Sequence, residues 1–212
     1  MSDTPVLRTV PGPDGRPRCR WCGAAPEFFP YHDSEWGFPV GDDIRLFEKL
    51  SLEAFQSGLS WRTILAKREN FRAAFDGFDF HRIAAYGEAD VARLLADTGI
   101  VRHRGKITAV INNAARAVEL VGEYGSLAAY FWKFEPDPAT NPLPQTVSVS
   151  PVSIALSKDL KRRGWAFVGP TTVFAFMQAM GLINDHAGEC AIRAEAEQAR
   201  RGFIRPGRAA GS

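Results

Sequence analysis

The chain has 212 residues, of which 45% are apolar and 24% are charged, and its formal net charge is +2. This length and composition allow one ordinary domain or two small ones, and they argue against disorder along most of the chain. Apolar runs such as residues 172–180 are too short to span a bilayer, so no membrane segment is expected. Residues 1–5 lack the basic and apolar pattern of a signal peptide.

The two ends of the chain are expected to be flexible tails around one domain. Residues 1–17 combine prolines and glycines without a periodic apolar pattern, and residues 202–212 are rich in glycine, arginine and alanine. Terminal segments of this composition are commonly poorly ordered. A single helical domain is therefore expected over residues 18–201.

Apolar residues recur at three- and four-residue spacing through most of this domain, which is the pattern of helices with one buried face. Asp42, Ser60 and Asp79 can cap such helices, while Pro151 and Pro170 stand at or near helix starts. The predicted helices span residues 44–55, 61–75, 79–86, 88–97, 104–124, 127–134, 151–163 and 171–180. Alternating strand patterns are nearly absent, so the predicted fold class is all-α.

Residues 94–107 predict two helices joined by a tight turn that contains glycine. Such a turn exposes backbone N–H groups at the start of the second helix, and these groups can hold a phosphate without reading a base. The candidate DNA contacts are Gly99, Arg102, Arg104, Gly105 and Lys106. The pattern indicates a DNA-binding hairpin, although an ordinary pair of helices joined through glycine has the same appearance.

Three cysteines are an odd number, and no secretory signal is seen, so metal binding or burial is favoured over disulfides. Cys19 and His32 lie near the start of the chain, and His186 and Cys190 lie near its end. One helical turn would place His186 and Cys190 on one face, and two Cys with two His make a closed tetrahedral zinc site. The spacing leaves two alternatives open, in which Cys22 replaces His32 or these side chains are merely buried.

Several stretches in a fixed order resemble the signature motifs of one family. Residues 31–37 read Tyr-His-Asp-Ser-Glu-Trp-Gly, residues 52–53 read Leu-Glu, and residues 58–61 read Gly-Leu-Ser-Trp. Residues 99–107 match the hairpin, and residues 181–186 read Gly-Leu-Ile-Asn-Asp-His. Together these motifs resemble the bacterial 3-methyladenine DNA glycosylase I family of the helix-hairpin-helix DNA glycosylase superfamily.

The resemblance implies a helix-hairpin-helix glycosylase fold with one structural Zn²⁺ that joins the N- and C-terminal segments. The family's ligand positions carry over to Cys19, His32, His186 and Cys190, which leaves Cys22 outside the site. A monomer is implied, which acts in the bacterial cytoplasm and associates with the nucleoid through DNA. Its partners would be double-stranded DNA that contains alkylated purines, and free 3-methyladenine as the product.

The same resemblance implies a base-binding pocket. Its aromatic residues would be Trp21, Phe28, Tyr31 and Trp61, with Phe28 where the family often has tyrosine. Methylation at N3 gives adenine in DNA a positive charge, and an aromatic face attracts a cation with about 0.5–2 kcal/mol. Glu53 is the expected catalytic residue, because a carboxylate in such a pocket can accept hydrogen bonds from the exocyclic amine and oppose the charge of the base.

The implied reaction is the flipping and hydrolytic removal of 3-methyladenine, with 3-methylguanine as the alternative substrate. Gly58, Leu59 and Ser60 form the loop expected to fill the space that a flipped nucleotide leaves. The predicted helix over 104–124 contains no aspartate, which fits a family that acts on labile cationic lesions. Release of neutral bases such as hypoxanthine, and cleavage of the DNA strand, are therefore not expected.

Overall fold

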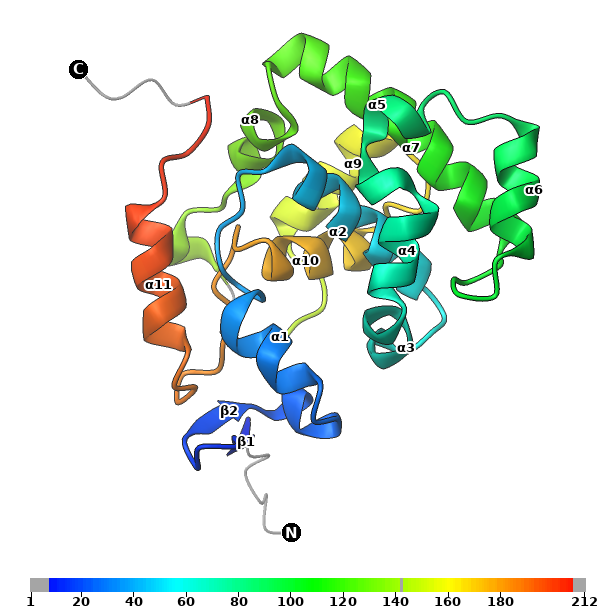
Figure 1. Ribbon diagram of the computed structural model, residues 1–212. Coiled ribbons are helices and arrows are strands. Elements are labelled where there is room, and N and C mark those ends of the chain that lie inside the picture. Colours follow the sequence, from blue (N-terminus) through cyan, green and yellow to red (C-terminus); the bar gives the residue numbers. More distant parts are fainter. Residues whose placement is uncertain (1–7, 142, 208–212) are drawn as a thin grey trace, which may run out of the picture.

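The computed structural model describes residues 8–141 and 143–207, and it consists mainly of helices around a central helix, α2 (Figure 1). The α-helices are α1 (Phe28–Ser34), α2 (Asp43–Gln56), α3 (Trp61–Ala66), α4 (Arg68–Ala74), α5 (Phe80–Ile83), α6 (Glu88–Ala96), α7 (Arg104–Tyr124), α8 (Leu127–Phe131), α9 (Pro151–Arg162), α10 (Pro170–Ala179) and α11 (Arg193–Gly202). The 3-10 helices are η1 (Arg20–Ala24), η2 (Asp76–Phe78), η3 (Trp132–Phe134) and η4 (Pro138–Thr140). One antiparallel hairpin pairs β1 (Thr9–Pro11) with β2 (Pro17–Cys19). The prediction of a mainly helical protein is confirmed.

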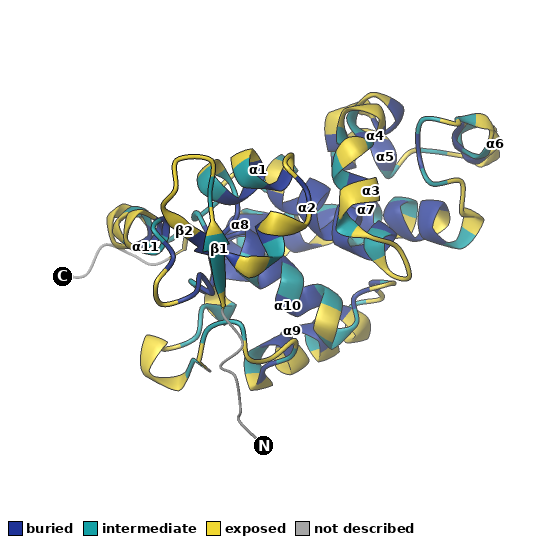
Figure 2. Cartoon of the chain, turned by 90° about the horizontal axis from the view of Figure 1, so that it is seen from below, coloured by how far each residue is buried: buried dark blue, intermediate teal, exposed yellow. Residues whose placement is uncertain are grey.

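Helix α2 is the buried centre of the molecule. Asp42 caps it, because its side chain accepts a hydrogen bond from the backbone N–H of Arg45 at 2.8 Å. Residues 46–55 are all buried, and the helix packs against α7, α8 and α10. Figure 2 shows this interior in dark blue, while α6 and α11 lie at the outside with exposed faces. A charged side chain within residues 46–55 therefore has to find a partner inside the protein.

Helix α10 packs against both α2 and α9. Pro151 and Pro170 are the first residues of α9 and α10, as the sequence predicted. Gly181 follows α10 with a φ of +73°, and a Cβ atom there would lie 2.5 Å from the backbone carbonyl carbon of Phe38. Only glycine fits so close to another backbone segment, so this contact holds the end of α10 against the segment that follows α1.

Part of the segment over residues 1–17, which was expected to be a flexible tail, forms a hairpin in the structure. Strands β1 and β2 pair there, and the backbone N–H of Gly12 donates to the carbonyl of Arg16 at 2.8 Å to close the turn. The glycines and prolines that suggested a tail form this turn, with Gly15 at a φ of +77°. Residues 1–7 lie outside the described residues.

The segment over residues 202–212 was also expected to be a flexible tail, and its first part packs against the domain in the structure. The Phe203 ring packs on Trp132, with ring centroids 4.5 Å apart, and Arg205 forms an ion pair with Glu135 at 2.7 Å. Aromatic packing and a paired charge hold this segment after α11, which composition alone did not indicate. The last part of it, from residue 208 onward, is outside the described residues.

Two predicted helices are shorter in the structure than expected. The helix over 61–75 divides at Lys67 into α3 and α4, and the Lys67 ammonium donates to the carbonyls of Thr98 and Gly99 at 3.1 and 3.0 Å. The helix over 79–86 is reduced to α5. Helices α1 and α11 were not predicted from the sequence. No helix among the described residues is both long and apolar enough to cross a membrane.

Arg200 on α11 is a buried cation that stabilises the fold. Its side chain donates to the carbonyls of Gly181 and Leu182 at 2.8 and 3.0 Å, and to Glu135 at 3.0 Å. We expect Arg200→Ala to lower the free energy of unfolding by about 3 kcal/mol, because two buried carbonyl groups lose their donor. Urea denaturation measures this loss. Arg201→Ala removes the exposed neighbour and should cost less than about 0.5 kcal/mol; equal losses in the two variants would contradict the role of Arg200.

Candidate active site and metal centre

A cavity of about 580 Å³ lies between α1, α2, the first turn of α3 and α10. This volume is in the range of small-molecule sites in proteins. The structure brings together in its wall all five residues predicted for a base pocket, which are Trp21, Phe28, Tyr31, Glu53 and Trp61. The wall also contains residues that were not predicted, among them Trp36, Gln145 and Gln178.

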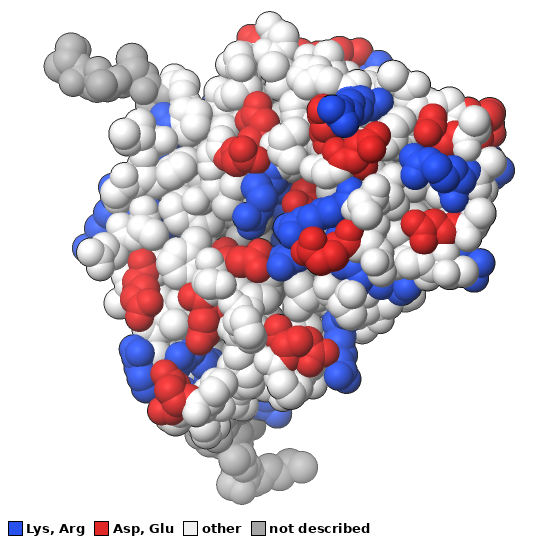
Figure 3. All heavy atoms as spheres, viewed as in Figure 1, with Lys and Arg blue, Asp and Glu red and all other residues white. Residues whose placement is uncertain are grey.

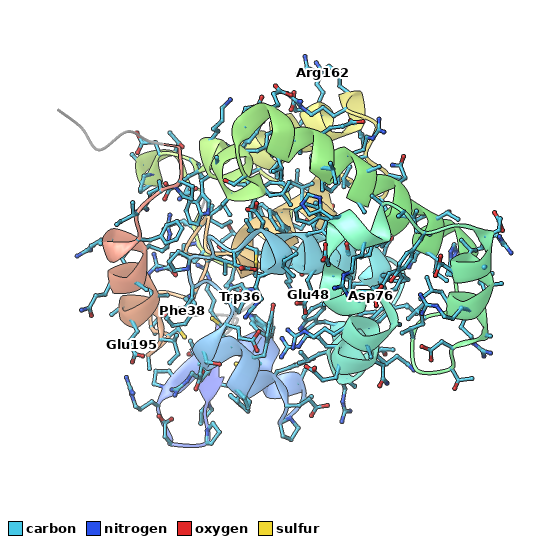
Figure 4. The ribbon with its side chains drawn as sticks, turned by 45° about the horizontal axis from the view of Figure 1, so that its top comes forward. Trp36, Phe38, Glu48, Asp76, Arg162 and Glu195 are labelled. Atoms are coloured by element: carbon cyan, nitrogen blue, oxygen red, sulfur yellow. The ribbon has the colours of Figure 1, made fainter. Side chains whose placement is uncertain are left out.

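The aromatic residues of the cavity contact one another at tilted or edge-on angles. The ring centroid of Trp21 lies 5.9 Å from that of Phe28 and 5.2 Å from that of Trp36. The rings of Tyr31 and Trp61 lie 5.3 Å apart. Figure 4 shows Trp36 between α1 and α2; its place in the motif over 31–37 was the signal available for it. The result is a packed aromatic wall that can stack on a planar cationic group.

Glu53 lies in the cavity wall with only 6% of its surface exposed. Its partner is Lys49, one turn earlier on α2, whose Nζ lies 2.7 Å from Glu53 Oε1. Lys49 also donates to Tyr31 Oη at 2.7 Å, and its Nζ lies 3.5 Å from the ring centroid of Trp61. The ion pair balances two buried charges, neither of which is stable there alone. Lys49 was not predicted, although its spacing of four residues from Glu53 was a signal for it.

Two aromatic residues separate Lys49 from the large cavity. Tyr31 and Trp61 line both the cavity and a much smaller recess, and Lys49 lines only the recess. Burial raises the pKa of Tyr31 well above its ordinary value, so the phenol keeps its proton. Burial also lowers the pKa of Lys49, and the negative charge of Glu53 opposes that shift.

A layer of ion pairs surrounds the recess. Arg68 donates to both carboxylate oxygens of Glu35, at 2.7 and 3.0 Å, and Arg72 lies 2.8 Å from Glu48. Figure 3 shows basic and acidic side chains gathered in the middle of this face. Glu48 extends from α2 where that helix faces α4 (Figure 4). The recess is therefore closed by paired charges that join α1, α2 and α4.

Asp185 holds two glutamines of the cavity wall. Gln178 Nε2 donates to Asp185 Oδ2 at 2.6 Å, and the backbone N–H of Gln145 donates to Asp185 Oδ1 at 3.1 Å. Gln145 has a φ of +60°, a strained conformation that these contacts hold. Burial raises the pKa of Asp185. The cavity thus has a second polar wall, supplied by α10 and the segments before α9 and after α10.

Three buried side chains from the two ends of the domain form a group that could hold a metal ion. Their ligand atoms all lie within 4.8 Å of one another, and they belong to Cys19, His32 and Cys190. His32 Nδ1 lies 2.7 Å from Asp33 Oδ1, which turns Nε2 toward Cys190 Sγ at 3.6 Å. A carboxylate in this outer position orients a histidine that binds a metal. The structure thus brings together three of the four predicted ligands.

His186, the fourth predicted ligand, lies beside this group. Its ring centroid is 4.9 Å from that of His32, and its Nδ1 lies 2.9 Å from Asn184 Oδ1. Its Nε2 is buried and has no hydrogen-bond partner among the described residues. A buried nitrogen without a partner, next to three metal-type ligands, fits a fourth ligand position.

The segment 186–190 is not the helical turn that the spacing predicted. The backbone N–H of Cys190 donates to the carbonyl of Ala187 at 3.0 Å in a turn, and the N–H of Ala187 donates to Cys19 Sγ at 3.3 Å. This turn brings Cys190 to Cys19. Cys22 lies outside the three-residue group: its thiol donates to the carbonyl of Cys19 at 2.8 Å, and burial raises its pKa to about 12.

The turn between α6 and α7 is held by side chains around it. The backbone N–H of Gly99 donates to Asp97 Oδ1 at 2.7 Å, and its carbonyl accepts from Asn70 Nδ2 at 3.2 Å. Arg102 and Arg104 are exposed next to this turn. The backbone of the predicted hairpin is therefore fixed, and two of its predicted basic contacts face solvent.

Lys106 differs from its predicted role as a phosphate contact. Its side chain is buried, and Nζ donates to the carbonyls of Phe55 and Ser57 at 2.9 and 2.5 Å. These carbonyls belong to the end of α2, where helical partners run out. Lys106 therefore joins α7 to the segment that carries Leu59.

Two exposed apolar side chains lie on segments that contact the start of α7. Leu59 is 42% exposed, and Phe167 is 41% exposed with its ring near His103. Phe167 has a φ of +55°, which is strained for an aromatic residue. The side chain of Asn113 holds this backbone by bonding both the N–H and the carbonyl of Ala166, at 2.8 and 2.9 Å. Phe167 was not predicted, because its exposure depends on this fixed backbone.

The chain is similar to known proteins along most of its length. The methyladenine glycosylase family model matches residues 21–194. DNA-3-methyladenine glycosylase 1 of Escherichia coli K12 is 46% identical over 182 residues, which cover 82% of this chain and 95% of the relative. DNA-3-methyladenine glycosylase of Haemophilus influenzae is 44% identical over 179 residues, with 82% and 96% covered.

Solved structures with the same fold agree with this similarity. A crystal structure of 3-methyladenine DNA glycosylase I matches with a TM-score of 0.74 at 47% identity, over 82% of this chain and 98% of that chain. A Staphylococcus aureus 3-methyladenine DNA glycosylase I, studied for its recognition of 3-methyladenine, matches with a TM-score of 0.74 at 35% identity, over 80% and 92%. The family predicted from the motifs is confirmed, and the chain belongs to the methyladenine glycosylase family.

Proposed function

We propose that this protein is a hydrolase of N-glycosidic bonds that removes 3-methyladenine from alkylated double-stranded DNA in base-excision repair. The observation that carries the proposal is the cavity in which Glu53 is surrounded by aromatic residues, in a chain of the methyladenine glycosylase family. The relatives in Escherichia coli and Haemophilus influenzae are named for this activity.

The positive charge of the methylated base makes it a good leaving group, and much of the proposed reactivity comes from this charge. Flipping the nucleotide into the cavity costs a few kcal/mol, and stacking on aromatic side chains returns about 1–3 kcal/mol. Water attacks C1′ of the deoxyribose while the bond from C1′ to N9 breaks. The electron pair of that bond neutralises the base, which leaves as 3-methyladenine, and the proton of the water goes to solvent. Glu53 accepts a hydrogen bond from the exocyclic amine. The Lys49 amine is engaged by Glu53 and Tyr31, which supports hydrolysis without strand cleavage.

The metal group is proposed to bind one structural Zn²⁺ through Cys19, His32, His186 and Cys190. Thiolate and imidazole ligands suit zinc, and four protein ligands close the site, so the ion would supply a cross-link and no reactive water. The Trp36 ring lies 4.7 Å from that of His186 and also lines the cavity. Zinc at this position would therefore stabilise the aromatic wall as well as the two ends of the domain.

DNA is proposed to lie across the turn between α6 and α7. The contacts would be the backbone at Gly99 and Gly105 and the exposed side chains of Arg102 and Arg104. The segment Gly58, Leu59 and Ser60 would fill the space left by the flipped nucleotide. Phe167 would add a second apolar contact beside the hairpin, since a strained and exposed aromatic residue is commonly functional. Lys106 is not part of this surface.

The protein is proposed to act as a monomer, as the resemblance to the family implies. A DNA substrate, together with bacterial relatives, supports action in the bacterial cytoplasm at the nucleoid.

Duplex DNA methylated in vitro tests the proposed function. We expect release of free 3-methyladenine that leaves abasic sites in uncut strands, and no release of hypoxanthine, because that base carries no charge. Chromatography of the released bases and denaturing gels measure both. Binding of alkylated DNA without base release would indicate a non-catalytic binding protein, and efficient release of hypoxanthine would contradict selection by charge.

Glu53→Ala should weaken the binding of free 3-methyladenine by about tenfold or more, because hydrogen bonds to charged groups contribute about 1.5–3 kcal/mol. Titration followed by tryptophan fluorescence measures this affinity, and circular dichroism checks the fold. Glu48→Gln is the matched control, since Glu48 lies on the same helix and pairs with Arg72 outside the cavity wall. Unchanged affinity in Glu53→Ala would rule out the proposed contact.

Cys190→Ser should remove most of the bound zinc and lower the free energy of unfolding by about 3 kcal/mol or more, because the site loses a thiolate ligand. Elemental analysis of the purified protein gives the zinc content, and urea denaturation gives the stability. Cys22→Ser is the control and should keep one zinc per chain, since Cys22 lies outside the metal group. Stoichiometric zinc in Cys190→Ser would show that the ligand set is wrong.

A further inference from the structure

Lys49 is a buried cation under the cavity wall that the proposed reaction does not use. We propose that Lys49 is a specificity-determining positioning residue: it fixes Tyr31 as a hydrogen-bond donor and Glu53 as an acceptor toward the cavity, so that the wall accepts 3-methyladenine and rejects 3-methylguanine. This inference rests on the proposed base-binding function of the cavity.

The contacts of Lys49 place it where it can act only through its neighbours. Its exposed fraction is 6%, and it lines the small recess and not the cavity. Its Nζ lies 2.7 Å from both Glu53 Oε1 and Tyr31 Oη, and these two residues do line the cavity. Lys49 thus connects the two polar groups of one wall from behind.

An ammonium group has three donors and no acceptor, so it determines the direction of the hydrogen bonds around it. Tyr31 Oη has to accept from Lys49, and the phenolic proton then finds no acceptor among the described residues. Glu53 accepts at Oε1, and its Oε2 has no donor within hydrogen-bond distance among the described residues. In the proposed arrangement the Tyr31 proton and Glu53 Oε2 face the cavity, and the wall offers it one donor and one acceptor.

This donor and acceptor match one edge of adenine. Adenine offers the N6 amine as a donor and N7 as an acceptor on the same edge, whereas guanine offers two acceptors, O6 and N7. The methyl group at N3 lies on another edge and leaves this pattern unchanged. A guanine in the same orientation would place O6 against the Glu53 carboxylate with no proton between them. Sites built around a hydrogen bond discriminate strongly against a base that leaves it unmade.

Without Lys49, Tyr31 would no longer be fixed as a hydrogen-bond donor toward the base, and Glu53 would no longer be fixed as an acceptor. The phenol of Tyr31 would be free to donate to the Glu53 carboxylate instead of to a base. A buried carboxylate that lacks its counter-ion takes up a proton. A protonated carboxyl group can donate to O6 of guanine, so the wall would then accept either purine.

The test compares release of 3-methyladenine and 3-methylguanine from methylated duplex DNA by wild type and Lys49→Met. We expect the ratio of the two single-turnover rates to fall by about tenfold or more, which corresponds to the loss of one hydrogen bond of about 1.4 kcal/mol. Lys49→Arg keeps a charged donor without an acceptor and should retain most of the selectivity. Arg72→Met removes a cation from the neighbouring ion-pair layer and should leave the ratio unchanged.

A second measurement shows whether Lys49 acts through Tyr31. The affinity for free 3-methyladenine should fall in Lys49→Met, and this effect should be much smaller when Tyr31→Phe is already present. If Lys49→Met does not fold, Lys49→Gln, which is neutral and has both a donor and an acceptor, provides the same comparison. An unchanged ratio in the folded variant, or an equal loss of both activities, would overturn the inference. Absence of base release by the wild type would instead refute the proposed function.

Discussion

Burial of α2 places Glu48, Lys49 and Glu53 where water cannot solvate their charges. Each of these charged groups has a partner at hydrogen-bond distance. Glu48 pairs with Arg72 of α4. Lys49 pairs with Glu53 and donates to Tyr31 of α1. An unpaired charge in this position would cost several kcal/mol, so these contacts hold α1, α2 and α4 in one arrangement. The cavity lies where α1 and α2 meet, and its shape therefore depends on the same pairing.

Helix α1 supplies side chains both to the cavity wall and to the metal group. Successive residues of a helix point in different directions, and so Tyr31 reaches the cavity and Lys49 while His32, the next residue, reaches Cys190. Trp36 lies against the His32 and His186 rings and also lines the cavity. A bound zinc ion would thus act on the aromatic wall through direct packing, without taking part in the reaction.

Helix α11 stabilises the segment that leads to the metal group, and most of this helix lies beyond the residues that the family model matches. The family match ends at residue 194, whereas α11 continues to Gly202. Arg200 on this helix binds the carbonyls of Gly181 and Leu182, shortly before His186 in the chain. The extension therefore supports the segment that carries the second half of the metal group.

Apolar periodicity and capping residues in the sequence determined α2, α7, α9 and α10, because helices form from contacts between neighbours in the chain. The motifs indicated five residues of the cavity wall, and the structure brings Glu53 and these aromatic neighbours together. Only the tertiary structure decided that Lys49 also contacts Tyr31, that Lys106 turns inward, and that the proline-rich N-terminal segment forms a hairpin. These features depend on which group lies opposite each side chain in space, and residues far apart in the sequence supply most of those groups.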